Sequence, residues 1–347
     1  MNKIFARIRE IKRTDLFVGI VVAIAIIAVI VFLSWLIGGS GSVIVSNQNP
    51  SSGKNRVSTI AGIKCARAED RPIAVMLASD TEARPLSGIG GADLVFEMPV
   101  TPNGITRLMA VFQCTLPLEI GSIRSAREDF IPLAEGIDAI LAHWGGERGV
   151  LATLDSGIID NVDAMKYEGS TFYRKNNIPR PHNGFTAPDL LFSRAQELEY
   201  RASTSLSGIF ERGSTSDKRG VTNTGDRILL AWPLEMGVEF KYDQKTRMYS
   251  RWRNGTSEID RLTGIQVSVP VVAVLSSSME FRYDQYVTMH VIGSGNADVY
   301  QGGIRTTGRW EKASASAPLK LTKQDGSSII LNPGKTWVIF NAPLLNP

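Results

Sequence analysis

The sequence contains few of the residues that bind metals or carry redox chemistry. Its 347 residues include three histidines and two cysteines, Cys65 and Cys114. The chain has no C-x-x-C pair and no cluster of histidine with cysteine, so we predict neither a metal site nor a cofactor. In an exported chain, two cysteines allow one disulfide between them, and two free thiols are the alternative.

Excess positive charge is nearly absent from most of the chain. The chain has 38 basic and 34 acidic residues, and residues 1–15 contain five of the basic and two of the acidic ones. The remainder therefore contains 33 basic and 32 acidic residues. A protein that binds nucleic acid needs a basic face on its folded part. The near balance therefore argues against nucleic acid as a partner.

One segment has no charge at all. Leu16–Ile37 reads LFVGIVVAIAIIAVIVFLSWLI, and Trp35 lies near its end. At about 1.5 Å per residue these 22 residues span roughly 33 Å, enough to cross a hydrocarbon core of about 30 Å. The basic residues of the tail 1–15 all precede the run. This asymmetry predicts a single-pass membrane helix with a cytoplasmic N-terminus and the bulk of the chain outside the cytoplasm.

Other processing of this segment is less consistent with the sequence. A cleaved signal peptide usually has an apolar run of about 7–15 residues followed by a small-residue site, and neither is found here. A lipoprotein would need a cysteine directly after the run, whereas the first cysteine is Cys65. Residues 38–64, which begin GGSGS, are predicted to form a flexible tether.

The remainder divides by pattern into two modules. Residues 65–205 are expected to form an α/β module, residues 206–228 a linker, and residues 229–347 a mainly-β module. The expected fold class is therefore an α/β N-terminal module plus a mainly-β C-terminal module, behind one N-terminal transmembrane helix. The first module should contain the strands Pro72–Ser79, Ala92–Met98, Arg107–Cys114 and Ala139–Ala142 and the helices Phe130–Gly136, Arg148–Asp155 and Pro188–Tyr200. The second should contain strands at Phe240–Tyr242, Met248–Trp252, Val271–Leu275, Tyr286–Ile292, Leu319–Thr322, Ser328–Leu331 and Thr336–Phe340.

Several strings in the first module match a known family. They are RPIAVML (Arg71–Leu77), ARPLSGIGGADLVFE (Ala83–Glu97), GITRLMAVFQ (Gly104–Gln113), IGSIRSAR (Ile120–Arg127), DAILAHWGG (Asp138–Gly146) and FYRKNNIPRPHN (Phe172–Asn183). In this order they resemble the YerB-like bacterial lipoproteins, whose conserved module is a domain of unknown function. LNPGKTWV (Leu331–Val338) is similar to the end of that family's C-terminal module. The resemblance implies a two-module extracytoplasmic protein. Those relatives often carry a lipid-modified cysteine, where this chain has a predicted anchor helix.

Arginines stand at the ends of the apolar runs of the first module. Arg84 follows the first strand, Arg107 opens the third, and Arg124 and Arg127 flank Ser125 before a predicted helix. Loops at strand ends form the ligand crevice of α/β sheets. Because guanidinium groups bind phosphate and carboxylate in a bidentate manner, these residues predict an anion-binding site. Local pairing of the arginines with carboxylates such as Asp129 is the structural alternative.

Further candidates lie on neighbouring segments. Glu97 ends the second strand and His143 the fourth, so both are candidates for acid–base catalysis, and His143 also for ligand contact. Arg174, His182 and Asn183 belong to a basic, proline-containing segment that is either a loop over the site or a connector. Glu97 as a base would need its pKa raised by burial, and hydrogen-bonded structural histidines are the alternative for His143 and His182.

Two functions fit these observations. In the first, the chain is a non-catalytic cell-envelope protein that recognises an anionic wall component or an envelope protein through the arginine-rich site. In the second, it is a cell-envelope enzyme that acts on a phosphate-bearing or glycan substrate. The order of anchor and α/β domain with arginines at strand ends is similar in layout to the LytR-type phosphotransferases.

Overall fold

The computed structural model describes residues 56–213, 225–230, 237–282 and 285–343. The predicted membrane helix Leu16–Ile37, the basic tail and most of the tether lie outside the described residues. Among the residues that the structure describes, no helix is both long and apolar enough to cross a bilayer.

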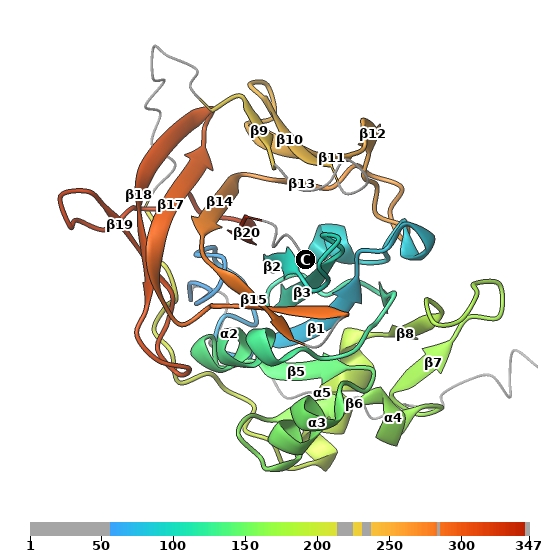
Figure 1. Cartoon of the computed structure of the whole chain (residues 1–347). Helices are drawn as coiled ribbons and strands as arrows, with labels where there is room; N and C mark the ends of the chain where they lie inside the picture. Colours follow the sequence, from blue (N-terminus) through green and yellow to red (C-terminus); the bar gives the residue numbers. More distant parts are fainter. Residues whose placement is uncertain (1–55, 214–224, 231–236, 283–284, 344–347) are drawn as a thin grey trace, which may run out of the picture. The chain divides into compact units, whose positions relative to one another are not determined.

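A ten-stranded mixed sheet contains strands from both sequence modules (Figure 1). Its order is β19 (Lys320–Lys323), β18 (Ile304–Lys312), β17 (Gly293–Gln301), β14 (Val271–Ser276), β20 (Thr336–Asn341), β2 (Leu94–Pro99), β3 (Thr106–Phe112), β1 (Ile73–Ala78), β5 (Ile140–His143) and β6 (Asn161–Asp163). The two halves of the sequence join where β20 pairs with β2 in parallel. The chain therefore builds a two-module fold around one continuous sheet.

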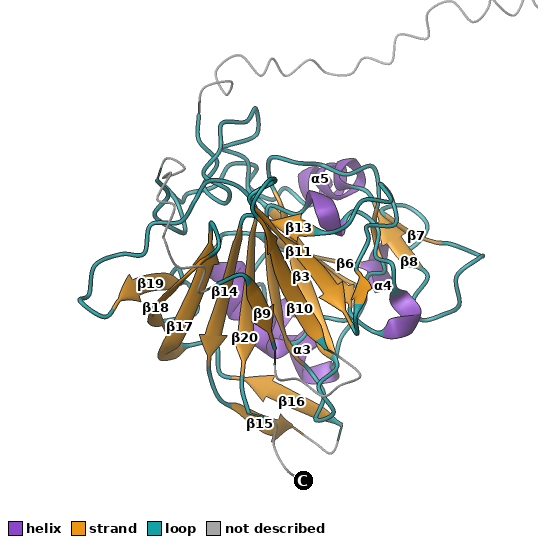
Figure 2. Ribbon diagram, turned by 90° about the horizontal axis from the view of Figure 1, so that it is seen from above, coloured by secondary structure: helices purple, strands orange, loops and turns teal. Residues whose placement is uncertain are grey.

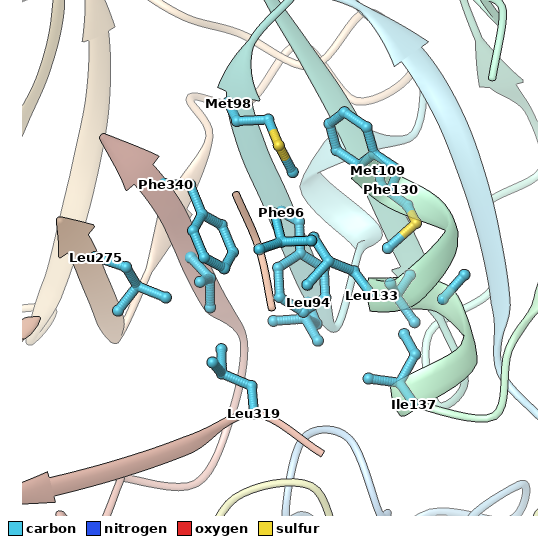
Figure 3. Close-up of a cluster of buried hydrophobic side chains, with 14 of the residues drawn as sticks. Leu94, Phe96, Met98, Met109, Phe130, Leu133, Ile137, Leu275, Leu319 and Phe340 are labelled. Carbon is cyan, nitrogen blue, oxygen red and sulfur yellow. The ribbon is translucent and has the colours of Figure 1, made fainter. Parts of the chain in front are cut away.

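The central strands are apolar because both of their faces are covered. All residues of β1, β2 and β3 are buried. Successive side chains point to opposite faces of a strand. On β2, Leu94, Phe96 and Met98 belong to one buried cluster and Val95 to the other. Figure 3 shows the first cluster, in which these three side chains lie toward Phe130 and Leu133 of the helical layer.

Short helices cover the face of the sheet that carries Phe96. The 3-10 helix η4 (Glu128–Phe130) runs directly into α2 (Ile131–Gly136), and α3 (Arg148–Asp155) follows β5. The remaining helical pieces are η2 (Thr81–Ala83), η3 (Ile89–Gly91), α4 (Ala164–Tyr167) and α5 (Pro188–Glu197). Pro188 begins α5, where the missing N–H of proline leaves no bond unmade.

A second sheet covers the opposite face. It consists of β9 (Arg227–Leu229), β10 (Val238–Asp243), β11 (Met248–Arg253), β12 (Thr256–Ser257) and β13 (Ser268–Val269). Figure 1 shows these strands on the side of β2 and β3 away from α2. Phe240 and Trp337 meet edge to face between the sheets, with ring centroids 5.8 Å apart.

Two smaller groups of strands complete the fold. β4 (Ile120–Gly121), β8 (Gly184–Thr186) and β7 (Phe172–Arg174) form a three-stranded sheet, and β15 (Met279–Arg282) pairs with β16 (Tyr286–Met289). Figure 2 shows the β15–β16 hairpin beyond one end of the large sheet. A hydrogen bond from the Val287 N–H to the Val100 oxygen (3.3 Å) fixes the hairpin to the residue that follows β2.

The cysteines are joined. Cys65 and Cys114 form a disulfide with a Cα–Cα distance of 5.7 Å. It ties the segment before β1 to the residues after β3, so the start of the described chain is held against the sheet.

Most predicted elements occur within a residue or two of their expected ends, and the helix Arg148–Asp155 has the predicted ends. The prediction of a strand at Ser328–Leu331 was wrong, because this segment forms only isolated bridges, from Ser328 to Thr322 and from Leu331 to Arg212. The hairpin β17–β18 was not predicted. Its exposed alternate residues gave no apolar run, and the hairpin signal at Gly302-Gly303, where both glycines have positive φ, went unused.

Candidate functional site

Arg107 lies at the point where three central strands meet at one end of the sheet. It is the second residue of β3 and stands opposite Ala78, the last residue of β1, and Met98 of β2. Its side chain points to the same face as Met109, two residues along the strand. Met109 belongs to the cluster that packs under α2. Arg107 is therefore on the helical side of the sheet, and it is 3% exposed.

The segment 122–127 brings two further arginines to this end. Along β1, pairing with β5 extends only over Ile73–Val75. Beyond Val75, residues 122–124 lie next to β1 in place of β5. The Ala78 N–H donates to the Ser122 oxygen (3.0 Å), and the Arg124 N–H donates to the Met76 oxygen (2.9 Å). The Trp144 N–H donates to the Arg124 oxygen (3.0 Å), which ties this segment to the loop after β5.

Alternation places Arg124 on the same face as Arg107. The side chain of Ile123 belongs to the cluster under the second sheet, so its neighbour Arg124 points to the helical side. Arg127 precedes η4 and α2, which cover that face. The structure thus brings together Arg107, Arg124 and Arg127, three residues that are 20 apart in the sequence at most.

The three guanidinium groups repel one another and are poorly partnered. Burial, followed by the charges of Arg127 and Arg124, lowers the pKa of Arg107 to about 9. Burial also lowers the pKa of Arg127. Within the described part of the chain, Nε and Nη1 of Arg107 have no hydrogen-bond partner, and neither has Nε of Arg124 or of Arg127. Buried polar groups are usually paired, so this cluster is an exception.

The C-terminal module supplies an aromatic side chain to the cluster. The ring of Tyr286, the first residue of β16, lies 4.7 Å from Cζ of Arg127. The Met289 N–H donates to Oδ2 of Asp129 (3.0 Å), which fixes β16 against η4. Arg282 of β15 forms an ion pair with Glu128. Burial raises the pKa of Asp129 to about 6.

Three further polar residues, Asp80, Ser122 and His182, belong to this end of the sheet. Asp80 follows β1, and its charge acts on both Arg107 and His182. His182 lies on the loop between β7 and β8, and burial lowers its pKa. Among the described atoms, Oδ2 of Asp80, Nδ1 of His182 and Oγ of Ser122 have no hydrogen-bond partner.

Glu97 belongs to a different buried network. Its Oε1 accepts from Thr106 Oγ1 (2.9 Å) and Arg251 Nη2 (3.0 Å), and its Oε2 accepts from Trp337 Nε1 (2.8 Å). Arg253 Nη2 also lies 3.2 Å from Oε1. Glu97 shares the face of Val95, so it points to the second sheet, away from Arg107. These donors fill its acceptor sites and fit a structural role better than a catalytic one.

Glu258 completes this network from the second sheet. It lies 2.9 Å from Nε of Arg251 and 3.2 Å from Nε of Arg253. The two arginines lower the pKa of Glu258 to about 2, against the opposing effect of its burial. Arg84 lies on this side as well. Burial lowers the pKa of Arg84, with a further contribution from the charge of Arg253.

The other candidates have partners of their own. His143 is fully buried, with Nδ1 2.9 Å from the Gly145 oxygen and Nε2 3.2 Å from Oδ1 of Asn161. Ser125 Oγ donates to the Trp144 oxygen (3.2 Å). These bonds correspond to the structural alternative for His143.

Arg174 and Asn183 bond to each other across the β7–β8 hairpin. Nη1 of Arg174 donates to Oδ1 of Asn183 (2.8 Å), and its guanidinium lies 4.0 Å from the centre of the Trp144 ring. Arg174 also pairs with Glu168 (2.7 Å). The two residues shape the hairpin whose loop presents His182.

Sequence reasoning missed Tyr286, Asp80 and Ser122. Asp80 directly follows the predicted strand Pro72–Ser79, and Ser122 lies two residues before Arg124. Their position beside the other candidates at this end of the sheet was a signal that could have identified them. Tyr286 is more than 150 residues from the arginines and nothing in the sequence linked them. Among the described residues, no three His, Cys, Asp or Glu side chains converge closely enough to hold a metal ion.

The fold can be compared with known proteins. Residues 60–201 match the family model described as "Protein of unknown function (DUF3048) N-terminal domain", and residues 230–338 match that of its C-terminal domain. The chain therefore belongs to the DUF3048 family. It is similar to the Bacillus subtilis (strain 168) protein named "Putative lipoprotein YerB", with 29% identity over 296 residues, which cover 83% of this chain and 87% of that protein.

The same relative has a known structure. The crystal structure of YerB from Bacillus subtilis matches with a TM-score of 0.73 and 28% sequence identity, over 82% of this chain and 96% of that one. The YerB-like family expected from the sequence strings is thus confirmed, together with its two-module organisation.

Proposed function

We propose that this protein is a membrane-anchored, extracytoplasmic component of the bacterial cell envelope that binds a phosphate-bearing ligand through Arg107, Arg124 and Arg127. The ligand is a wall component or a group on an envelope partner. The observation that carries the proposal is Arg107, a guanidinium that is 3% exposed, has two unpartnered nitrogens and lies beside two like charges.

The energetics support a ligand of negative charge. A buried charge costs several kcal/mol unless an opposite charge compensates it. Asp80 is the acidic residue whose charge most favours the charged form of Arg107, and one carboxylate does not neutralise three guanidinium groups. A phosphate oxyanion offers several acceptor oxygens and up to two negative charges, which fits unpartnered N–H groups on three arginines.

The membrane location rests on the sequence. The uncharged run Leu16–Ile37 has its flanking cations on the N-terminal side only. The name of the Bacillus relative, which describes a lipoprotein, supports the same side of the membrane with a different anchor. We expect a reporter enzyme that functions only outside the cytoplasm to be active when it is fused after Pro347. Activity only of a reporter that functions in the cytoplasm would refute the topology.

Ligand binding is tested by titration calorimetry on the full chain in a mild detergent. Methyl phosphate should bind the wild type, and Arg107→Met or Arg124→Met should weaken binding at least tenfold, because each removes a charge-assisted donor. Arg309→Met is the matched control, since Arg309 is exposed on β18 and far from the cluster in the sheet order. Equal affinity in all four proteins would refute the site.

A second candidate is catalysis on a phosphate-bearing or glycan substrate at the same cluster. The observation that favours it is His182, whose pKa is lowered by burial and whose Nδ1 is unpartnered among the described atoms. A neutral imidazole beside bound phosphate has the properties of a general base. Turnover of a phosphodiester by the wild type but not by His182→Gln would favour the enzyme. Saturable binding without turnover would favour the binding protein.

A further inference from the structure

Asp80 is an acidic residue in the middle of a cationic cluster. It is the second residue after β1 and directly precedes η2, and its side chain forms no capping hydrogen bond with that helix. Its Oδ2 is buried and has no hydrogen-bond partner among the described atoms. Asp80 lies two residues after Ala78, which stands opposite Arg107 in the sheet, and its charge acts on Arg107 and on His182.

This arrangement differs from an ordinary ion pair. An aspartate that served only to neutralise the arginines would be expected to accept their N–H groups directly. Here Oδ2 of Asp80 and both Nε and Nη1 of Arg107 are buried without bonds to each other. The location therefore holds buried acceptors and buried donors together. A ligand that satisfies both needs an anionic group for the arginines and a donor group for the carboxylate.

We propose that the site recognises a phosphate ester whose alcohol portion carries a hydroxyl or ammonium group close to the phosphate, with Asp80 as the specificity-determining residue. The phosphate lies against Arg107, Arg124 and Arg127, and the hydroxyl or ammonium donates to Oδ2 of Asp80. This inference rests on the proposed function, because it assigns the second half of the same ligand. Polyol phosphates and amino-alcohol phosphates belong to this class.

Asp80 is a suitable residue for such selectivity because it works against the binding of simple anions. Its negative charge repels any phosphate at the arginines, so the carboxylate lowers affinity for a ligand without a donor. A ligand with a donor recovers that loss through a hydrogen bond to a charged acceptor. One residue thus both rejects bare phosphate esters and selects substituted ones.

The test compares three ligands by titration calorimetry on the full chain in a mild detergent. Methyl phosphate carries no donor on its alcohol portion, glycerol 1-phosphate carries hydroxyls, and O-phosphoethanolamine carries an ammonium. We expect the wild type to bind glycerol 1-phosphate or O-phosphoethanolamine at least tenfold more tightly than methyl phosphate. The better of the two identifies the donor.

Substitution of Asp80 should raise the affinity for methyl phosphate and lower the relative affinity for the donor-bearing ligands. In Asp80→Ala, methyl phosphate should bind several-fold more tightly than to the wild type, and the preference for the donor-bearing ligand should fall below threefold. Asp80→Asn keeps an acceptor oxygen without the charge and should retain part of the preference for glycerol 1-phosphate. Asp189→Ala, which removes an exposed carboxylate of α5, is the control and should leave all affinities unchanged.

The outcomes separate the two proposals. If methyl phosphate binds and depends on Arg107 but the donor-bearing ligands bind no more tightly, the role of Asp80 is refuted and the anion site stands. The same holds if Asp80→Ala weakens all three ligands equally, as a structural role would predict. If none of the three binds to the wild type, the proposed function itself is refuted.

Discussion

Replacing Arg107 with methionine should stabilise the folded protein while it removes ligand binding. Arg107 is 3% exposed, and burial lowers its pKa to about 9, well below the usual range of a guanidinium group. Because this pKa is lower in the folded than in the unfolded chain, folding opposes the charge. The penalty is present in full below pH 9 and declines as the pH rises above that value, until the unfolded chain also loses the proton. At pH 7 the whole cost is therefore included in the free energy of unfolding.

The size of the effect follows from the same values. The fall of the pKa of Arg107 from its usual range to about 9 corresponds to ~5 kcal/mol. Methionine keeps much of the apolar stem and adds no charge, but it leaves some space that the guanidinium filled. We therefore expect Arg107→Met to raise the free energy of unfolding by roughly 2–4 kcal/mol at pH 7.

Urea titration of the full chain, followed by tryptophan fluorescence, measures this difference. The buried Trp310 and Trp337 report on the core of the large sheet. The same experiment with methyl phosphate at about 100 times its dissociation constant for the wild type should stabilise the wild type by ~2.7 kcal/mol and Arg107→Met by ~1.4 kcal/mol at most, because binding to the variant is at least tenfold weaker. Destabilisation of the variant by more than 1 kcal/mol would refute the reasoning, because it would show that Arg107 is held by favourable contacts.

Three other predictions concern the framework around the site. Glu97→Gln should lower the free energy of unfolding by about 3–5 kcal/mol in urea titration, because the two buried arginines Arg251 and Arg253 would then share Glu258 as their one carboxylate in this network; a loss of function without destabilisation would instead indicate catalysis. The raised pKa of Asp129 contributes stability that is present below pH 3.8 and lost as the pH rises through about 6, so the wild type should lose roughly 2 kcal/mol relative to Asp129→Asn between pH 4 and pH 7. An unchanged difference between the two proteins over that range would contradict it. Reduction of the Cys65–Cys114 disulfide, which closes a separation of 49 residues, should cost about 4 kcal/mol by urea titration, and no change would show that the loop is constrained without it.

The elements that the sequence predicted well share a physical cause. The strands β1, β2 and β3 are buried on both faces, and only continuous apolar runs satisfy that requirement. Helix α5 begins at a proline, which is a strong local signal. By contrast, β17 and β18 have one exposed face, and their residues alternate with glycine and polar groups. These two strands pair with each other through the two-residue turn Gly302-Gly303, a local signal that apolar periodicity does not reveal.

The candidate site shows the same division. Arg107, Arg124 and Arg127 were predicted to form one site from their places beside apolar runs, and that site stays a prediction. Glu97 also ends a strand, yet it points to the opposite face. The face depends on its register with β3, and a difference of one residue reverses it.

The placement of Tyr286 follows from the way the two modules share their sheet. β20 of the C-terminal module pairs with β2, and the hairpin β15–β16 is held to the end of β2 through Val100. The N-terminal module supplies the arginines and the C-terminal module supplies the ring beside them. We therefore expect neither module alone to form the complete cluster.

The most direct measurement of the central claim is a crystal structure of the protein soaked with selenate, whose selenium is located by anomalous scattering. We predict a selenium peak in the cluster, with selenate oxygens at about 3 Å from Nη1 of Arg107 and from Arg124 or Arg127. Selenium peaks on exposed arginines only, with the cluster filled by water or by its own side chains, would contradict the account.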